Sequence, residues 1–256
     1  MNYKTTKYFT ISKKRKIKYY FLNNKSQITA VFFHGFMSDM MGAKPTSIQK
    51  FCRKNKINFL KFEYSGHGKS SGTFIEGNIS KWTFDAKKLI KTKIKSNQKL
   101  IFIGSSMGSW IALNLFSTFK KNIIGFIGIA SAPEFLEELM WKKFSKKIKN
   151  EINTKKFYNI ESGDFTYPIT KQLIVNGRQN KVLNNKINLP IPVTLFHGLK
   201  DEVVPLKFSK RIISFCKNSK TKLIKIKSGN HSLSRNSDLK KISKELKSIV
   251  KNSSFI

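Results

Sequence analysis

Residues 104–108 read GSSMG, which matches the pattern G-x-S-x-G with Ser106 at its centre. The apolar run Leu100–Ile103 precedes this pentapeptide, and a helical pattern over Trp110–Phe119 follows it. A strand, a sharp turn and a helix in this order present the central serine at an apex, where its hydroxyl can attack an acyl carbonyl. Glycines are needed there because side chains two residues to either side would collide with neighbouring backbone. The alternative is a plain strand-to-helix turn packed with small residues, so the chemistry requires partners elsewhere in the chain.

A serine hydroxyl becomes a useful nucleophile only when a base removes its proton. The chain has four histidines. His34 and His197 each directly follow a predicted strand, and His67 lies in the loop SGHG. His231, in SGNHSLS, comes after the last predicted strand and before the terminal helix, where a general base is expected late in the chain. We predict His231 as the base and His34 as a structural residue that bonds loop backbone.

The base needs an acid to orient it, and Asp201 in HGLKDEVVP is the candidate. It follows the apolar run IPVTLF, so it lies at the carboxyl end of a predicted strand, at the same sheet edge as the serine turn. Chemistry alone does not exclude its neighbour Glu202, which we expect to point away. The order Ser106, Asp201, His231 is that of one of the known triad arrangements.

Acyl transfer also needs hydrogen-bond donors for the oxyanion that develops on the carbonyl oxygen. The amide of Met107 directly follows the serine at a predicted helix N-terminus and is one candidate. The second should come from the loop after an earlier strand, where FFHGFMSD places Gly35 for close backbone approach. We predict the amide of Phe36 as this second donor.

The elements that must position these residues alternate between short apolar runs and longer amphipathic stretches, the pattern of a mainly parallel sheet. Strands are predicted at residues 28–33, 57–63, 100–103, 123–129, 191–196 and 223–226. Helices are predicted at residues 44–55, 82–94, 110–119, 208–216 and 238–250, and two β-rich runs surround a turn at residues 12–15. The fold class is therefore α/β, with a mostly parallel central sheet flanked by helices.

Residues 133–190 interrupt the alternation, so residues 1–256 are expected to form a single domain with a small cap insertion. The stretch from Ala132 to Phe157 predicts an amphipathic helix, and residues 167–182 predict a hairpin. Helical spacing predicts a substrate groove lined by Phe135, Leu136, Leu139, Met140 and Trp141. The alternative is that these side chains only pack against the core below.

The formal net charge of +36 comes almost entirely from lysine. Arginine occurs only at Arg15, Arg53, Arg178, Arg211 and Arg235. Because arginine is favoured for bidentate recognition of phosphates and bases, this composition argues against specific nucleic-acid binding. The lysines are scattered along the chain, which favours a solvated surface.

No apolar stretch is long enough to span a membrane, and the N-terminus has no apolar signal region. Cys52 and Cys216 fit the buried faces of helices, without metal-site or disulfide spacing. We therefore expect a cytoplasmic protein without a cofactor or metal.

Taken together, HGF, SGHGKS, GSSMG, HGLKDEVVP and GNHS resemble landmarks of the α/β-hydrolase superfamily over nearly the whole chain. FHGFMSDMMGAK and GSSMGSW are similar to the branch that contains the mitochondrial palmitoyl-protein thioesterase, also described as an acyl-glucuronide esterase, and its bacterial relatives. The resemblance implies nucleophile, acid and base at Ser106, Asp201 and His231. Without an organellar presequence, it also implies a bacterial protein.

The leading expectation is a serine hydrolase that cleaves carboxylic esters or thioesters of small molecules or acylated proteins. The same residues would serve a serine peptidase or a C–C hydrolase, because fold alone does not decide the reaction. A third hypothesis is a non-catalytic protein that binds polyanions. Serine at position 106 excludes the members of this fold that use an aspartate nucleophile.

Overall fold

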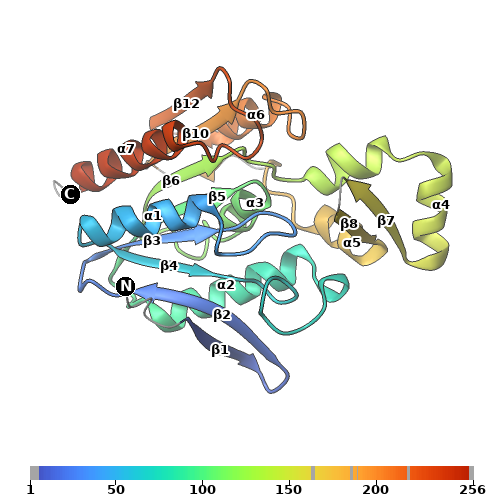
Figure 1. Cartoon of the computed structure of the whole chain (residues 1–256), viewed down its shortest axis with the longest axis horizontal. Coiled ribbons are helices and arrows are strands. Elements are labelled where there is room, and N and C mark those ends of the chain that lie inside the picture. The colour runs from blue at the N-terminus through green and yellow to red at the C-terminus, as the bar shows by residue number, and fades with distance from the viewer. Residues whose placement is uncertain (1–5, 163–164, 185–186, 189, 218–219, 254–256) are drawn as a thin grey trace.

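The computed structural model describes residues 6–162, 165–184, 187–188, 190–217 and 220–253 (Figure 1). In this part of the chain the central feature is an eight-stranded sheet in the order β1-β2-β4-β3-β5-β6-β10-β12. Its strands are β1 (Lys7–Ser12), β2 (Arg15–Leu22), β3 (Ile28–Phe33), β4 (Asn58–Phe62), β5 (Lys99–Ser105), β6 (Ile123–Ile129), β10 (Pro192–Gly198) and β12 (Lys220–Ile226). From β4 to β12 neighbouring strands run parallel, whereas β1 and β2 pair antiparallel. The predicted fold class, a mostly parallel sheet, is confirmed.

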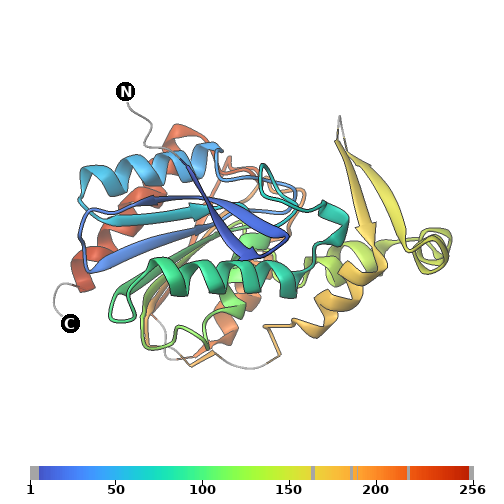
Figure 2. The same ribbon diagram turned by 90° about the horizontal axis from the view of Figure 1, so that it is seen from below.

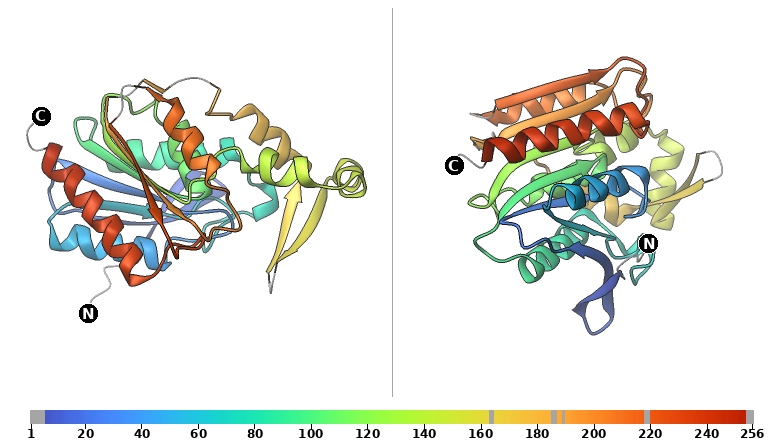
Figure 3. Two further views of the ribbon diagram at one scale, coloured as in Figure 1. Left: turned by 90° about the horizontal axis from the view of Figure 1, so that it is seen from above. Right: turned by 60° about the vertical axis from the view of Figure 1, so that its left-hand side comes forward.

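Helices cover both faces of this sheet (Figures 1 and 3). They are α1 (Ala43–Lys54), α2 (Ile79–Lys93), α3 (Met107–Asn114), α6 (Lys207–Phe215) and α7 (Asn236–Ser253). Because successive side chains of a strand point to opposite faces, Phe32 packs with α1 and α7 while Phe33 packs with α2 and α3. Both phenylalanines are almost completely buried. The central strands β3 (ITAVFF) and β6 (IIGFIGI) are therefore almost entirely apolar, as expected where a sheet is covered on both faces, whereas the outer strands β1 and β12 carry exposed lysines.

The predicted positions of the core elements agree with the structure, and the differences lie at their ends. Strand β6 has the predicted bounds, and β1 and β2 form a hairpin around the predicted turn. Helix α3 ends at Asn114, although the apolar spacing predicts helix as far as Phe119. The amides of Leu115 and Phe116 bond to carbonyls three residues earlier, which tightens the chain into turns after the helix.

The prediction of one long helix at the start of the insertion is wrong. The chain instead forms a π-helical turn at Leu136–Met140, a 3-10 turn at Trp141–Lys143 and helix α4 (Lys146–Lys155). Ser145 separates the turns from the helix, because its hydroxyl caps the start of α4 by accepting the amide of Ile148 at 3.3 Å. A capping side chain at this position outweighs the helical spacing of the apolar residues.

The predicted hairpin at residues 167–182 is also wrong in place. The hairpin consists of β7 (Phe157–Ser162) and β8 (Phe165–Thr170), and the chain then enters helix α5 (Lys171–Gln179). Thr170 caps this helix, its hydroxyl accepting the amide of Leu173 at 3.2 Å. The short strands β9 (Ile187–Asn188) and β11 (Cys216–Lys217) pair with each other away from the main sheet.

Helices α4 and α5 and the β7–β8 hairpin lie together beyond one end of the central sheet (Figures 1 and 2). In the hairpin Ile160 pairs with Tyr167, and Asn159 pairs with Pro168. The two pairs face opposite sides, because adjacent residues of a strand alternate in direction. Ile160 and Tyr167 line the cavity next to Ser106, whereas Asn159 and Pro168 line a separate outer groove.

No helix in the described ranges is long and apolar enough to cross a bilayer. Cys52 and Cys216 are both buried free thiols, as predicted. Burial raises the pKa of the Cys52 thiol to about 12 and that of the Cys216 thiol to about 11. Both side chains therefore act as packing groups rather than as reactive thiolates.

Candidate active site

Ser106 lies at the turn between β5 and α3, in a backbone conformation that non-glycine residues rarely adopt (φ 51°, ψ −119°). The glycines on either side allow the close packing that this turn requires. A Cβ atom at Gly108 would lie 2.1 Å from the carbonyl oxygen of Phe33, and one at Gly104 would lie 2.5 Å from Cα of Ser109. The strain at Ser106 is therefore maintained by packing against neighbouring backbone.

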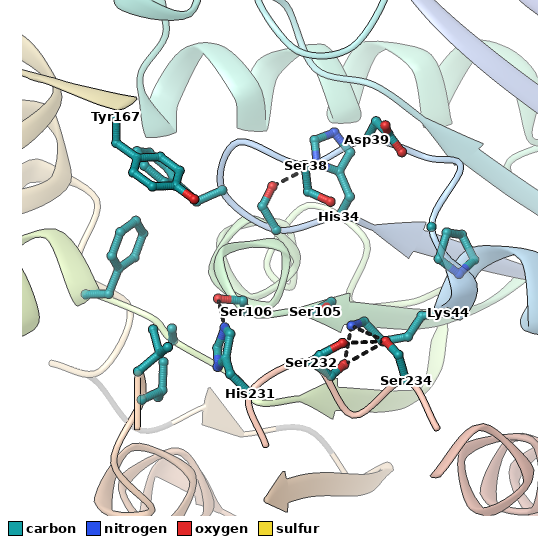
Figure 4. A pocket seen from close by; sticks show the side chains of 18 of the residues that line it. His34, Ser38, Asp39, Lys44, Ser105, Ser106, Tyr167, His231, Ser232 and Ser234 are labelled. Carbon is teal, nitrogen blue, oxygen red and sulfur yellow. Dashed lines mark hydrogen bonds between the residues drawn. The ribbon is translucent and has the colours of Figure 1, made fainter. Parts of the chain in front are cut away.

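Ser106, His231 and Asp201 form one chain of hydrogen bonds. The Ser106 hydroxyl and Nε2 of His231 are 3.1 Å apart, and Nδ1 of His231 is 2.9 Å from Oδ2 of Asp201. Figure 4 shows Ser106 and His231 facing each other at the wall of a pocket. With a proton on Nδ1 that is donated to Asp201, Nε2 is free to accept the proton of the serine hydroxyl.

The Asp201 carboxylate is fully buried and is satisfied from three directions. Besides the bond from His231, Oδ1 accepts the amides of Val203 at 3.0 Å and Val204 at 2.8 Å. Burial alone would raise the pKa of Asp201, but the bonds from His231 and Val204 outweigh it and hold the pKa below its ordinary value. The adjacent Glu202 is exposed and makes none of these contacts, which agrees with the choice of Asp201.

The other three histidines are buried away from the serine hydroxyl or engaged with backbone. Nδ1 of His34 is 2.8 Å from the carbonyl oxygen of Gly35, which agrees with its predicted structural role. His197 lies between Ser209 and Val204, bonded at 2.9 and 3.0 Å, and is 1% exposed. His67 packs among aromatic rings, and its Nε2 has no hydrogen-bond partner within the described residues. His231 alone of the four bonds to Ser106.

The buried pair His34 and His67 predicts a loss of stability in mild acid. Burial lowers the pKa of His34 to about 4 and that of His67 to about 3, whereas in the unfolded chain both have a pKa near 6.5. Between pH 6.5 and these values the unfolded chain takes up protons that the folded protein does not, so stability falls as pH falls. Urea unfolding should show the free energy of unfolding dropping by several kcal/mol from pH 7 to pH 4, on the order of 1.4 kcal/mol per pKa unit.

A His67→Phe variant should lose a large part of this pH dependence, because the replacement ring does not titrate. Phe74→Leu is the matched control, since Phe74 contacts His67 in the same aromatic cluster with ring centroids 5.2 Å apart. Phe74→Leu should lower the free energy of unfolding by a similar amount at pH 7 and at pH 4. If the free energy of unfolding of His67→Phe fell from pH 7 to pH 4 as much as that of wild type, the prediction would be contradicted.

A pocket of about 690 Å³ opens beside Ser106 and His231. Phe135, Leu139 and Met140 of the predicted groove line it. Leu136 and Trp141 do not, so their assignment to the groove is wrong. The π-helical turn spreads residues that an α-helix would place on one stripe. Leu136 is fully buried against α5, and the Trp141 ring lies 4.9 Å below the Arg178 guanidinium.

The loop after β3 passes directly over Ser106. A Cβ atom at Gly35 would lie 3.5 Å from Cβ of Ser106, so the backbone approaches the serine closely there. The next residue, Phe36, lines the pocket, and Met107 begins helix α3. The first amides of a helix have no partner within the helix. Both predicted donor residues are therefore in segments next to Ser106.

Sequence reasoning missed part of the pocket wall. Residues that the sequence analysis did not assign to it include Lys44 at the start of α1, Ile160 and Tyr167 of the hairpin, and Ser232 and Ser234 beside His231. Figure 4 shows Tyr167 on one side of Ser106, and Lys44 with the two serines on the other. The pocket thus has an apolar end toward the insertion and a polar end toward α1.

Known proteins share both the sequence and the fold. Residues 24–162 match the family described as serine aminopeptidase, S33. The chain is 28% identical over 214 residues to the mouse (Mus musculus) protein named palmitoyl-protein thioesterase ABHD10, mitochondrial, covering 82% of this chain and 70% of the relative. A putative hydrolase from Agrobacterium vitis S4 is 26% identical with a TM-score of 0.90, over 96% of this chain and 98% of that one.

The solved structure of mouse α/β hydrolase domain-containing protein 10 has a TM-score of 0.87 at 24% identity, over 97% of this chain and 99% of that one, and this likeness supports the fold. The family match covers more than half of the chain. The α/β-hydrolase fold, the matched family and the related hydrolases all agree with the resemblance noted in the sequence. The chain therefore belongs to the serine aminopeptidase S33 family and is an α/β-hydrolase.

Proposed function

We propose that this protein is a serine hydrolase that cleaves carboxylic esters or thioesters through an acyl-enzyme intermediate. The observation that carries the proposal is the hydrogen-bonded chain from Ser106 through His231 to the buried Asp201, at the wall of an apolar-ended pocket. The thioesterase name of the mouse relative supports the choice of bond. Small-molecule esters and acylated proteins are the proposed substrates.

In the proposed reaction, Ser106 Oγ attacks the acyl carbonyl while Nε2 of His231 takes its proton. Asp201 holds the imidazole with its proton on Nδ1 and stabilises the imidazolium that forms. We assign the amides of Phe36 and Met107 as donors to the oxyanion, since both lie next to the serine. His231 then protonates the leaving alcohol or thiol, and water repeats the sequence on the acyl-enzyme.

We assign the apolar end of the pocket to the acyl chain, with residues 133–190 acting as a cap. Large hydrophobic side chains from three segments form this end: Phe36, Phe135, Leu139, Met140, Ile160 and Tyr167. Removing such a chain from water favours binding by roughly 0.8 kcal/mol per buried CH₂ group. The pocket volume of about 690 Å³ supports short to medium chains.

The test is hydrolysis of p-nitrophenyl esters and acyl thioesters in a chain-length series. Leu139→Trp should narrow the apolar end, so kcat/KM for a decanoyl substrate is expected to fall by about tenfold. Acetyl substrates should be little affected. Val175→Trp is the matched control, because Val175 is exposed in the outer groove and does not line the pocket. No hydrolysis of any ester or thioester by the wild-type protein would refute the proposal.

The family description favours a second candidate, an aminopeptidase. An alanyl or prolyl anilide assayed beside the acyl esters separates the two reactions. A peptidase that takes free N-termini needs a carboxylate for the substrate ammonium group. Within the described residues, Asp39 is the carboxylate that lines the pocket, and it lies near Lys61. Burial lowers the pKa of Lys61 to about 8, and the charge of Asp39 opposes that shift. A carboxylate that already lies near a lysine is less available to a substrate ammonium group, so this arrangement favours ester and thioester hydrolysis over aminopeptidase activity.

For the compartment, we propose a reducing environment such as the cytoplasm, on the ground that both cysteines are free thiols. The mouse relative is named as a mitochondrial protein. Fractionation of the source cells, followed by immunodetection, would distinguish the two locations.

A further inference from the structure

Lys44 joins two segments that are far apart in the sequence. It is the second residue of α1, and its Nζ donates to the backbone carbonyl of Ser232 and, at 3.5 Å, to the hydroxyl of Ser234. Ser232 directly follows His231. Figure 4 shows these bonds beside the histidine, within the same pocket. Lys44 therefore contacts the loop that carries the proposed base.

The loop between β12 and α7 is held firmly at its two ends. Near its start, the Gly229 carbonyl accepts the amide of Lys200 at 2.8 Å. Near its end, Arg235 bonds to Asp238 at 2.9 Å and to the Ser228 hydroxyl at 2.7 Å. In the middle, residues 231–234, the backbone amides of Ser232 and Leu233 bond within the loop, to Oδ1 of Asn230 at 3.1 and 3.4 Å. Within the described part of the chain, Lys44 supplies the hydrogen bond that ties this backbone to an element outside the loop.

The middle of the loop is also under backbone strain. Leu233 has a φ of 46°, in the left-handed region that a leucine rarely adopts. Its side chain is fully buried, which fixes one side of the residue. Lys44 fixes the other side through the preceding carbonyl, that of Ser232. Such a conformation persists only where the surroundings determine it, so loss of the lysine should let the loop relax.

The charge of Lys44 is not balanced by an acid. Burial lowers the pKa of its ammonium to about 8, and no salt bridge to Lys44 is found among the described residues. Lys61 differs in having acids nearby. Burial also lowers the pKa of Lys61 to about 8, but Asp39 and Glu63 partly oppose that shift. A desolvated cation without a carboxylate is costly. The hydrogen bonds from Lys44 to the Ser232 carbonyl and the Ser234 hydroxyl offset part of this cost.

We propose that Lys44 is a positioning residue that holds the loop of residues 231–234 so that Nε2 of His231 meets the Ser106 hydroxyl. The inference rests on the proposed function, because it assigns a role in the same reaction. A displacement of about 1 Å in a catalytic group can cost on the order of 100-fold in rate. The lysine acts on the step of proton transfer, so its effect belongs to kcat rather than to substrate binding.

The test uses Lys44→Met in the full-length protein, assayed with a neutral p-nitrophenyl ester. The expected result is a fall in kcat of about 10- to 100-fold with KM little changed. The rate of labelling of Ser106 by a fluorophosphonate should fall in parallel. Lys44→Arg keeps a charged donor and should recover part of kcat. Lys50→Met is the matched control, an exposed lysine on the same helix, and should behave as wild type.

Two results would overturn the inference: an unchanged kcat in Lys44→Met, or a raised KM with unchanged kcat, which would make Lys44 a substrate contact. If Lys44→Met does not fold, Lys44→Gln and Ser234→Ala are judged by the same division between kcat and KM. Wild-type hydrolysis that depends on Ser106 but not on Lys44 refutes this inference alone. A wild-type protein without hydrolysis or labelling refutes the proposed function as well.

Discussion

Replacing Ser106 with alanine is expected to lower kcat for ester hydrolysis by about 10⁴- to 10⁶-fold. In the proposed reaction the oxygen of this hydroxyl forms the acyl-enzyme, so its removal abolishes the covalent step. Alanine is close in volume and leaves the Cβ atom in place, so the packing of the turn should not change. Melting temperature should therefore stay near that of wild type, and fluorophosphonate labelling should disappear.

Ser105→Ala is the matched control for this experiment, because the two serines are adjacent and both line the pocket. Ser105 is the last residue of β5 and is 7% exposed, whereas the bond to His231 belongs to Ser106. The control variant should keep kcat within the same order of magnitude as wild type. Labelling that survives in Ser106→Ala and vanishes in Ser105→Ala would overturn the assignment of the nucleophile.

Asp201→Asn is expected to lower kcat by about 10⁴-fold with little change in protein fold. The amide is nearly the same size as the carboxylate and still accepts the amides of Val203 and Val204. Its NH₂ group, however, can donate to Nδ1 of His231 and so place the imidazole proton on Nε2. In that tautomer the ring cannot accept the proton of Ser106, and the reaction stops at its first step.

The measurement is kcat across pH for Asp201→Asn beside Glu202→Gln. Because its hydrogen bonds hold the pKa of Asp201 below the ordinary value, the wild-type carboxylate stays ionised through neutral and mildly acidic pH. Glu202 is exposed, and its variant should match wild type across the range. Equal losses in the two variants would mean that the acidic segment acts through its overall charge and not through the bond to His231.

The sheet and the Ser106, Asp201 and His231 cluster could be predicted because their signals are local or ordered along the chain. The pentapeptide GSSMG carries its own steric requirement, and Asp201 and His231 each follow a recognisable strand. Such strands end at a common edge of a parallel sheet, so residues that directly follow them meet in space. The order of elements therefore contains the information needed to assemble this part of the site.

The insertion could not be predicted in the same way, because single capping residues decided its structure. Ser145 and Thr170 begin α4 and α5, and neither stands out against the helical spacing of the apolar residues around it. Lys44 was missed for a different reason. Its partner Ser232 is 188 residues away, and no motif in either segment refers to the other. Contacts of this kind depend on the finished packing of α1 against the last loop.

The alternation of the β7–β8 hairpin has a consequence for how this chain can diversify. Ile160 and Tyr167 face the cavity beside Ser106, and Asn159 and Pro168 face the outer groove. Neither pair belongs to the central sheet. The Tyr167 ring stacks on Phe36 with ring centroids 6.4 Å apart, whereas mutations at Asn159 and Pro168 need not disturb the cavity. If the cavity binds the acyl chain as proposed, one face of the hairpin can change to alter acyl preference while the other face changes independently. The residues that line the cavity and those that line the outer groove lie on opposite faces of the hairpin and can change separately.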